Sequence, residues 1–493
     1  MGIIATGAMA LRMFVPTITG LADDGSSHRL TCPLGLVPSV GSNESPFFEF
    51  LVLRWNRGDL TDGCPDFPTT ERWLISGAQI LTSWFGLPGA LDLRVLALLW
   101  CLLTGVAVAA LFAFLRTTLV RRTVAAAALF TILADSAFVD YAASMNVQLA
   151  AMSGVLIALL GLILIFDPDK PSIAGCLFFT FGGVLAVGAE PGNAVLVLPF
   201  LFILATIRLP LPALVSRWSC RLIPGACAMV LTFVSMTVYL GEDTRLEDTR
   251  VYNQAFLGIL GNSSDPHKDS EDLGLPTTFA NYASQSWWAH PTAREDPSWL
   301  THSRSISTAS IRTYLLGHPG KALDLASRSA QDLLSFRPAK IGTYPREAAN
   351  PPRSADCRWC VVSAIGQIFA PRALSALLLY LSVCSLLAAV FVRALPRNHP
   401  AWRFGVAAGF LTALTLVAFV SAMLSDPLES TKAMILPAFI ASLLPAMFLG
   451  MWCLSNQQPL TLVPDPKPIG PLPAPHLQNE SVTAGLTHRR TNS

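Results

Sequence analysis

Long apolar runs without charged side chains constrain this chain more than any other feature of its sequence. Val95–Leu115, Leu222–Leu240 and Ala373–Val392 contain no Asp, Glu, Lys or Arg. Each is close to the roughly 20 residues that an α-helix needs to cross a bilayer. Because backbone groups in lipid must hydrogen-bond within their own segment, these runs predict transmembrane helices.

Ten segments show this pattern and predict an all-α integral membrane protein with about ten transmembrane helices and two larger external segments. Charged residues make up only 13% of the 493 residues, about half the fraction found in soluble domains. This excludes an ordinary cytosolic enzyme, a disordered chain and a basic nucleic-acid-binding protein. The predicted spans are Gly2–Ile18, Val95–Leu115, Thr123–Val139, Val147–Phe166, Ser172–Ala189, Pro191–Ile207, Leu222–Leu240, Ala373–Val392, Phe404–Ser425 and Ala433–Ser455.

The first of these segments has a second interpretation. Its apolar part is short enough to be the core of a secretory signal peptide, and it contains Arg12. However, no basic region precedes it, and Ala8-Met9-Ala10 comes too early for a cleavage site. A first transmembrane helix is therefore favoured over a cleaved signal, and the true start codon stays open.

Basic residues in the connections predict the orientation. Ten Lys and Arg residues fall in alternate connections on one side of the predicted bundle. The short loops on the other side contain a single basic residue, Lys432. Since cytoplasmic loops carry the excess of positive charge, both termini are expected in the cytoplasm. The predicted divisions are a first helix (1–19), an external loop with an interfacial helix near its end (20–90), six helices (91–240), an external segment (241–371), three helices (372–455) and a disordered cytoplasmic tail (456–493).

Four cysteines fall in the predicted external segments, where disulfides persist. Cys32 and Cys64 share the first loop, and Cys357 and Cys360 form a CxxC before the eighth helix. In the cytosol a CxxC indicates zinc or redox chemistry. Outside, with no second CxxC and no nearby His, a structural disulfide is the favoured interpretation.

Two adjacent acids, Asp23 and Asp24, follow the first predicted membrane exit. A solvated turn explains them, because Asp is a common turn former. The alternative is a catalytic base or a metal-holding pair at the bilayer surface. Further acids, Asp135, Asp426 and Glu429, lie in or near the short external loops, where surface solvation explains the last two about as well as a functional role.

Four loop motifs resemble those of a known family. They are Asp23-Asp24-Gly25-Ser26-Ser27-His28-Arg29, Asp135 with Tyr141 and Ser144, Glu190-Pro191-Gly192-Asn193, and Asp426 with Glu429 and Lys432. The order of these motifs, the number of predicted helices and the two large loops resemble those of the GT-C superfamily of polytopic glycosyltransferases. Within that superfamily, the chain is most similar to the bacterial glycan biosynthesis hexose transferase group. Ser26, Gln148, Glu190 and Ala433 depart from that group's pattern.

The resemblance implies a function. Such proteins move a sugar, here a hexose, from a polyprenyl-phosphate carrier to a cell-envelope glycan outside the bacterial cytoplasmic membrane. It implies a carboxylate as base and cations, or a divalent metal, on the leaving phosphate. The implied partners are the lipid bilayer, the lipid-linked donor and a glycan acceptor, without nucleic acid. The candidate residues are Asp23 and Asp24 as catalytic acids, and as metal ligands if a metal is used, with His28, Arg29, Lys432, Asp135, Tyr141, Asp426 and Glu429 for substrate or phosphate binding.

Three alternatives stay open. A catalytically impaired GT-C-like scaffold would keep the architecture, and the departures from the motifs favour it. A transporter or flippase would need polar groups or broken helices near the bilayer centre, which the apolar spans argue against. A glycan ligase or polymerase of the same envelope pathway would share the membrane topology.

Overall fold

Helices dominate the computed structural model, which describes residues 1–39, 49–58, 64, 68–167, 172–207, 219–303, 306–338 and 340–455. The predicted tail 456–493 lies outside the described residues, as do the predicted cytoplasmic Lys170, Arg208 and Arg217.

Six helices in the described part of the chain are long and apolar enough to cross a membrane, and a bent pair could add a seventh. The bent pair joins α5 (Leu119–Leu133) to a segment made of α6 (Ser136–Val139) and η2 (Asp140–Ala143) at an angle of 53°. The six are α4 (Leu93–Phe114), α7 (Gln148–Ile165), α10 (Ser219–Leu240), α17 (Ala373–Ala394) with the preceding α16 (Val361–Phe369), α18 (Trp402–Met423) and α20 (Ile435–Leu454).

Three further predicted spans form shorter helices. They are α1 (Gly2–Phe14), α8 (Ile173–Val187), and η3 (Pro191–Leu196) with α9 (Val197–Thr206). A helix of this length covers about 20–25 Å, less than the roughly 30 Å hydrocarbon core. All ten predicted segments are thus helical, but their length and composition support six or seven crossings, and ten stays a prediction.

Small residues bring α7 and α8 into backbone contact. A Cβ added at Gly154, Gly161 or Gly182 would lie 2.5, 2.3 or 2.3 Å from a backbone atom of the other helix. Glycines at a helix interface allow this close approach in a membrane, where packing rather than the hydrophobic effect holds helices together. α7 therefore lies at the centre of the bundle, with most of its side chains buried.

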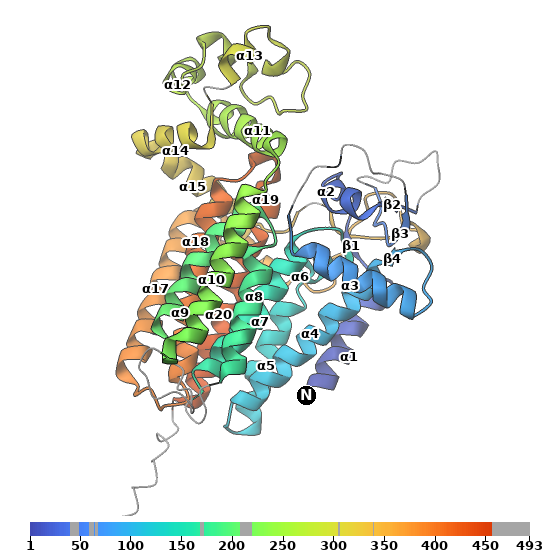
Figure 1. Ribbon diagram of the computed structural model, residues 1–493, viewed down its shortest axis with the longest axis vertical. Helices are drawn as coiled ribbons and strands as arrows, with labels where there is room; N and C mark the ends of the chain where they lie inside the picture. Colours follow the sequence, from blue (N-terminus) through green and yellow to red (C-terminus); the bar gives the residue numbers. More distant parts are fainter. Residues whose placement is uncertain are drawn as a thin grey trace, which may run out of the picture.

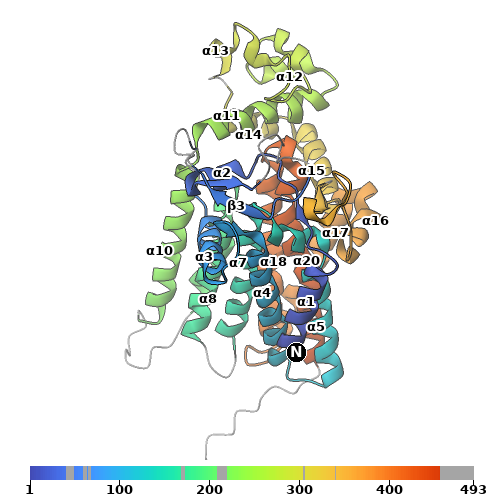
Figure 2. The same ribbon diagram turned by 90° about the vertical axis from the view of Figure 1, so that its right-hand side faces the viewer.

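The remaining elements gather at one end of the bundle (Figures 1 and 2). The late external segment forms a helical head, which includes α11 (Thr244–Asn253), α12 (Pro266–Asp272), α13 (Trp299–His302), α14 (Thr308–Gly317) and α15 (Pro319–Leu334). This head has its own core, centred on the buried rings of Tyr252, Phe256 and Phe279. α15 begins at Pro319, which suits the first turn of a helix because the N–H it lacks would have no partner there.

Two small antiparallel sheets anchor the first external loop. β1 (Gly20–Leu21) pairs with β5 (Ile341–Thr343), so the chain leaving the first helix is held by a strand more than 300 residues away. β2 (Leu36–Pro38), β3 (Arg54–Arg57) and β4 (Leu91–Asp92) form the second sheet. Only glycine fits at residue 20, because a Cβ there would lie 2.6 Å from the Ala143 carbonyl oxygen.

The predicted interfacial helix corresponds to α3 (Glu71–Trp84), which has two different faces. Trp73, Ile80 and Trp84 are exposed, whereas Ile75 and Ala78 are buried against the protein. Ala78 therefore belongs to the protein-facing side of this helix. Exposed Trp side chains at the edge of a bundle suit the headgroup layer of a membrane.

Both external cysteine pairs are bonded in the structure. Cys32–Cys64 joins the end of α2 (His28–Thr31) to the chain before α3, with the two Cα atoms 5.5 Å apart. Cys357–Cys360 closes a tight loop directly before α16. This loop contacts the bundle, because the Trp359 carbonyl accepts a hydrogen bond from the Ser136 N–H (2.7 Å).

Candidate functional site

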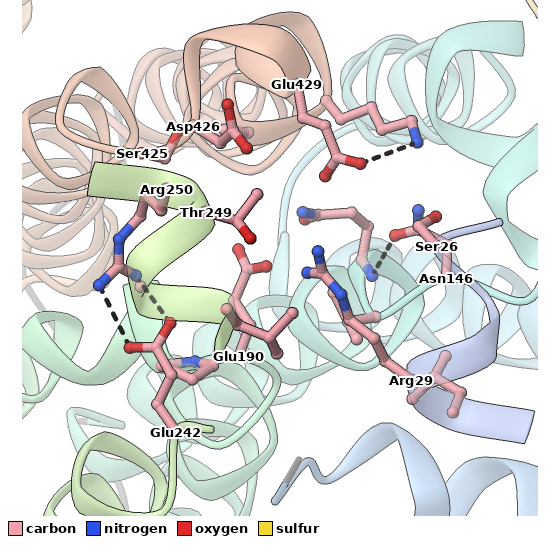
Figure 3. A pocket seen from close by; sticks show the side chains of 18 of the residues that line it. Ser26, Arg29, Asn146, Glu190, Glu242, Thr249, Arg250, Ser425, Asp426 and Glu429 are labelled. Atoms are coloured by element: carbon pink, nitrogen blue, oxygen red, sulfur yellow. Dashed lines mark hydrogen bonds and ion pairs between the residues drawn. The ribbon is translucent and has the colours of Figure 1, made fainter. Parts of the chain in front are cut away.

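Five connections meet around one small polar cavity at the end of the bundle that carries the head (Figure 3). Its volume is about 140 Å³. Its lining contains four carboxylates and three cations, contributed by the loop after β1, the starts of α7 and η3, the start of the head, and the connection from α18 to α20. The charged lining residues are Arg29, Glu190, Glu242, Arg250, Asp426, Glu429 and Lys432.

The acidic motif that begins at Asp23 folds into a turn, and its two aspartates have different partners. Asp23 accepts hydrogen bonds from the N–H groups of Gly25 (3.0 Å) and Ser27 (3.3 Å) and from the Ser27 hydroxyl. Gly25 has a φ of +92°, which favours glycine. Burial raises the pKa of Asp23, although the Ser27 and Gly25 hydrogen bonds oppose it. Asp23 therefore braces its own loop and does not line the cavity.

Asp24 binds a cation from the other end of the chain. Its carboxylate forms an ion pair with Lys432, which lies in α19 (Ser430–Ala433) and is also 3.8 Å from Glu429. Burial alone would raise the pKa of Asp24, but the Lys432 ammonium and hydrogen bonds outweigh it and lower the pKa. Asp24 is therefore ionised at neutral pH and ties the first external loop to the last one.

His28 and Arg29 are adjacent in the sequence, but of the two only Arg29 lies at the cavity. Arg29 lines the cavity, and its guanidinium has no hydrogen bond or ion pair with the described part of the chain. His28 is exposed and is not part of the lining. Arg29 is thus available to an anion in the cavity, whereas His28 is not placed there.

Gln148 and Glu190, which differ from the motifs of the glycosyltransferases that the chain resembles, lie side by side in this cavity. Burial and the neighbouring Glu429 carboxylate raise the pKa of Glu190 to about 7. Arg29 and a hydrogen bond with Gln148 oppose that rise. The neutral amide of Gln148 can therefore lie beside the Glu190 carboxyl group. An acid at both positions would place two negative charges next to each other, and they would repel.

The head contributes the opposite wall of the cavity. Asn253, at the end of α11, donates hydrogen bonds to both carboxylate oxygens of Asp426 (3.0 Å each). Burial raises the pKa of Asp426, although Asn253 opposes it. Arg250 is paired with Glu242 at 2.8 Å. The contact between Asn253 and Asp426 ties the head to the connection between α18 and α20, whereas the Arg250–Glu242 pair lies within the start of the head.

Two residues predicted for substrate binding lie elsewhere. Asp135 follows α5, and its carboxylate accepts hydrogen bonds from the N–H groups of Ala137 (3.0 Å) and Val362 (2.8 Å). It therefore caps α6 and anchors α16. Tyr141 is fully buried and lies within electrostatic range of Asp24 and Glu429, but it does not line the cavity.

Several polar residues that matter for the site were not singled out from the sequence. Glu242 directly follows the predicted span Leu222–Leu240, so the rule that selected Asp23 could also have selected it, and Arg250 is its partner two turns along α11. Arg12 and Asp140 form a buried pair with 3.5 Å between Nη2 and Oδ1. The sequence feature that could have revealed them is a charged residue in or beside an apolar segment, because such a residue is expected to have a partner.

The two aspartates of the motif do not fit a metal site as they are arranged. Their oxygens bind the N–H groups of the turn, the Ser27 hydroxyl and the Lys432 ammonium. Within the described ranges, no group of three or more His, Cys, Asp or Glu residues is placed to hold a metal ion.

A family model described as the YfdI N-terminal transmembrane domain matches residues 1–458, which is most of the chain. No curated protein matches the chain, and no solved structure matches it.

Proposed function

We propose a function for this chain as a member of the YfdI N-terminal transmembrane domain family, to which it belongs by a match over residues 1–458. It is an integral multi-pass membrane protein. We infer that it is a glycosyltransferase of GT-C type, which moves a hexose from a polyprenyl-phosphate carrier to an envelope glycan outside the cytoplasmic membrane. One observation carries this proposal: loops far apart in the sequence meet at one charged cavity at the external end of the bundle.

In the proposed reaction, a hydroxyl of the acceptor attacks the anomeric carbon of the lipid-linked sugar. The hydroxyl proton passes to the Asp24 carboxylate, a new C–O bond forms, and the bond between the anomeric carbon and the phosphate oxygen breaks. Polyprenyl phosphate leaves with the electron pair, so its oxygen gains negative charge. Cations fixed near that oxygen lower the barrier.

The cavity residues suit these roles. Arg29 is available to bind the phosphate, and Lys432 adds a second positive charge next to Asp24. Glu190, Asp426 and Glu429 offer oxygens to sugar hydroxyls. Asp23 holds the turn that carries Asp24, so we assign it a positioning role. The site lies at the end of the bundle, where a phosphate linked to a membrane-bound chain is confined.

The test is a transfer assay with purified protein and synthetic polyprenyl phosphates that carry radiolabelled glucose, galactose or mannose. We expect Asp24→Asn to lower transfer by about 10² or more, as for a general base. Arg29→Ala should raise the KM for the donor by about tenfold, because it removes a charge-assisted contact to phosphate. Asp248→Asn is the matched control, since Asp248 is exposed on α11 and outside the lining.

Two results would count against the proposal. If the wild-type protein transfers none of the three hexoses to envelope glycan or to water, the glycosyltransferase assignment fails. If the wild type is active and Asp24→Asn keeps full activity, Asp24 is not the base.

A second candidate is a non-catalytic envelope assembly protein. The Asp24–Lys432 ion pair favours it, because each group already neutralises the other. This candidate predicts that Asp24→Asn and Arg29→Ala leave envelope glycans normal in cells whenever the protein reaches the membrane. It also predicts that exchanging the charges, with Asp24→Lys and Lys432→Asp together, restores function. The enzyme hypothesis predicts that the exchange leaves the protein inactive.

A further inference from the structure

Most of the positive charge that lines the polar cavity is already paired. Lys432 forms an ion pair with Asp24, and Arg250 forms one with Glu242. Among the described residues, Arg29 is the lining cation without such a partner. Two of the three lining cations are therefore neutralised before any ligand enters.

Three lining carboxyl groups lack a cation of their own. Asp426 accepts its side-chain hydrogen bonds from the neutral amide of Asn253. Glu429 is 3.8 Å from Lys432, a cation that another carboxylate already binds. Glu190 is the third of these groups. The cavity thus carries an excess of negative charge, and an entering anion is repelled unless one carboxyl group takes up a proton.

Glu190 is the group best placed to take up that proton. Burial and the Glu429 carboxylate raise its pKa to about 7. Its hydrogen-bond partner is the Gln148 amide, which donates to a carboxylate and equally accepts from a protonated acid. Asp426 differs, because Asn253 donates to both of its oxygens and so favours the charged form.

The backbone that carries Glu190 is fixed on both sides. The Thr70 N–H, at the start of α3, donates to the Gly188 carbonyl (2.8 Å). The Glu190 carbonyl accepts the Asn193 N–H (2.9 Å), and Pro191 begins η3 directly after it. The carboxyl group is therefore held in the cavity from two elements, and a change in protonation is its response to an entering charge.

The charged groups that act on Glu190 come from three elements. Arg29 lies on α2, Glu429 ends η11 (Pro427–Glu429), and Glu242 precedes α11. An anion bound at Arg29 neutralises the one cation among them and adds a further negative charge, so it raises the pKa of Glu190. By linkage, anion binding takes up a proton wherever Glu190 is ionised in the empty cavity. The other charged lining residues, held in the contacts described above, are Arg250, Asp426 and Lys432.

We propose that Glu190 is a specificity residue of this cavity: a phosphate ester binds at Arg29 together with one proton, which Glu190 holds. The protonated carboxyl group donates its O–H to a phosphate oxygen. A singly charged phosphodiester then binds better than a doubly charged phosphomonoester, because the second charge faces the Asp426 and Glu429 carboxylates. The choice of a phosphate ester rests on the proposed function, in which the donor is a diester and the leaving group a monoester. The excess of negative charge and the fixed position of Glu190 do not depend on it.

The test measures binding rather than transfer. A water-soluble, short-chain prenyl phosphodiester of glucose is titrated by calorimetry against the full-length protein in nanodiscs. The diester keeps one charge at pH 6 and at pH 8, so any pH dependence comes from the protein. We expect the wild-type Kd to be about tenfold higher at pH 8 than at pH 6, as for one proton on a group that titrates near pH 7.

Glu190→Gln mimics the neutral form of the side chain. We expect this variant to bind the diester at pH 8 as tightly as the wild type does at pH 6, with no change in Kd between the two pH values. Glu247→Gln is the matched control, because Glu247 is exposed on α11 and lies outside the lining. It should keep the pH dependence of the wild type.

The proton is also counted on the wild type alone, by repeating the titration at pH 8 in two buffers with different enthalpies of ionisation. We expect uptake of about one proton per bound diester. No uptake, no diester binding at either pH, or an unchanged pH dependence in Glu190→Gln would overturn the inference.

Inorganic phosphate tests the selectivity for charge. It is mostly doubly charged at pH 8 and should compete about tenfold less well than the diester. Equal competition would overturn the assignment of Glu190 as a specificity residue. Proton-linked binding by a protein that transfers no sugar would instead reject the proposed enzyme function, so the two failures are distinguishable.

Discussion

At the scale of single residues, several buried acids of this protein serve backbone groups rather than chemistry. Asp135 binds the N–H groups at the starts of α6 and α16. Glu71, almost completely buried, accepts a hydrogen bond from the Ala150 N–H (2.6 Å) in the first turn of α7. A helix start offers unpaired N–H groups, so the oxygens of a buried acid find hydrogen-bond donors there.

Glu71 makes a pH-dependent prediction. Burial raises its pKa from 4.5 to about 8. The folded state therefore keeps a proton that the unfolded chain loses above about pH 4.5, and the stability contributed by this proton falls as pH rises towards 8. Each pKa unit is worth about 1.4 kcal/mol, so the full loss is on the order of several kcal/mol at most.

Replacing Glu71 with glutamine should remove this dependence, because the Gln carbonyl still accepts the Ala150 N–H. We expect Glu71→Gln to raise the melting temperature relative to wild type at pH 9 and to give little gain at pH 4. Thermal unfolding of detergent-purified protein at both pH values measures this. Glu271→Gln, on the exposed face of α12, is the control. Equal melting shifts at pH 4 and pH 9 would refute the prediction.

At the scale of elements, the first external loop is held by contacts that span the chain. β1 pairs with β5, the Cys32–Cys64 bond closes the segment after α2, and Asp24 pairs with Lys432. This loop carries Arg29 into the polar cavity. The position of the motif therefore depends on a late strand and a late helix as well as on its own turn.

The Cys32–Cys64 bond makes the prediction at this scale. In the chain-entropy account, a bond closing a loop of this size stabilises by about 3–4 kcal/mol. We expect the double variant Cys32→Ser/Cys64→Ser to melt at a lower temperature and to be cleaved faster by protease between β1 and α3. Mass spectrometry of non-reduced wild type should find the linked peptide. Reductant should lower the melting temperature of the wild type by more than that of the variant, which keeps only the Cys357–Cys360 bond among these two. An equal effect on both proteins would refute this account.

At the scale of the whole molecule, the head and the loop that follows β1 lie at the same end of the bundle (Figure 1), and residues of both line the polar cavity. The positive-inside pattern predicts that this end faces away from the cytoplasm. With both termini on the cytoplasmic side, the chain must cross the membrane an even number of times. The structure supports six or seven crossings by helix length, and these two numbers give different orientations. The orientation thus needs a direct measurement.

Reporter fusions provide that measurement. A fusion after Gly261, in the head, should be active only with an enzyme reporter that folds outside the cytoplasm. A fusion after Pro396, between α17 and α18, should be active only with a fluorescent reporter that requires the cytoplasm. The reverse pattern would invert the protein and place the candidate site inside. Two fusions with the same reporter behaviour would show that the span between them is miscounted.

The sequence alone determined the membrane class of this protein and the positions of its helical segments. Hydrophobic length is a local property, so an uncharged run such as Val95–Leu115 predicts its helix without knowledge of its neighbours. The lengths of these runs predict ten crossings, whereas the lengths of the helices support six or seven. The numbers differ because helices such as α8 and α9 are shorter than the apolar runs that contain them. The same local reasoning found the acidic turn and the two external cysteine pairs.

Tertiary structure alone decided which of the candidate residues share a site. Asp24 and Lys432 are 408 residues apart, and only helix packing brings them into contact. The same packing gives Asp135 a role as a helix cap, leaves His28 outside the cavity and places Gln148 beside Glu190. An apolar cavity of about 860 Å³, bounded by α5, α15, α16, α17 and α20, had no sequence signal, because lipid-facing and cavity-facing side chains are equally apolar, and only the arrangement of these five helices separates them.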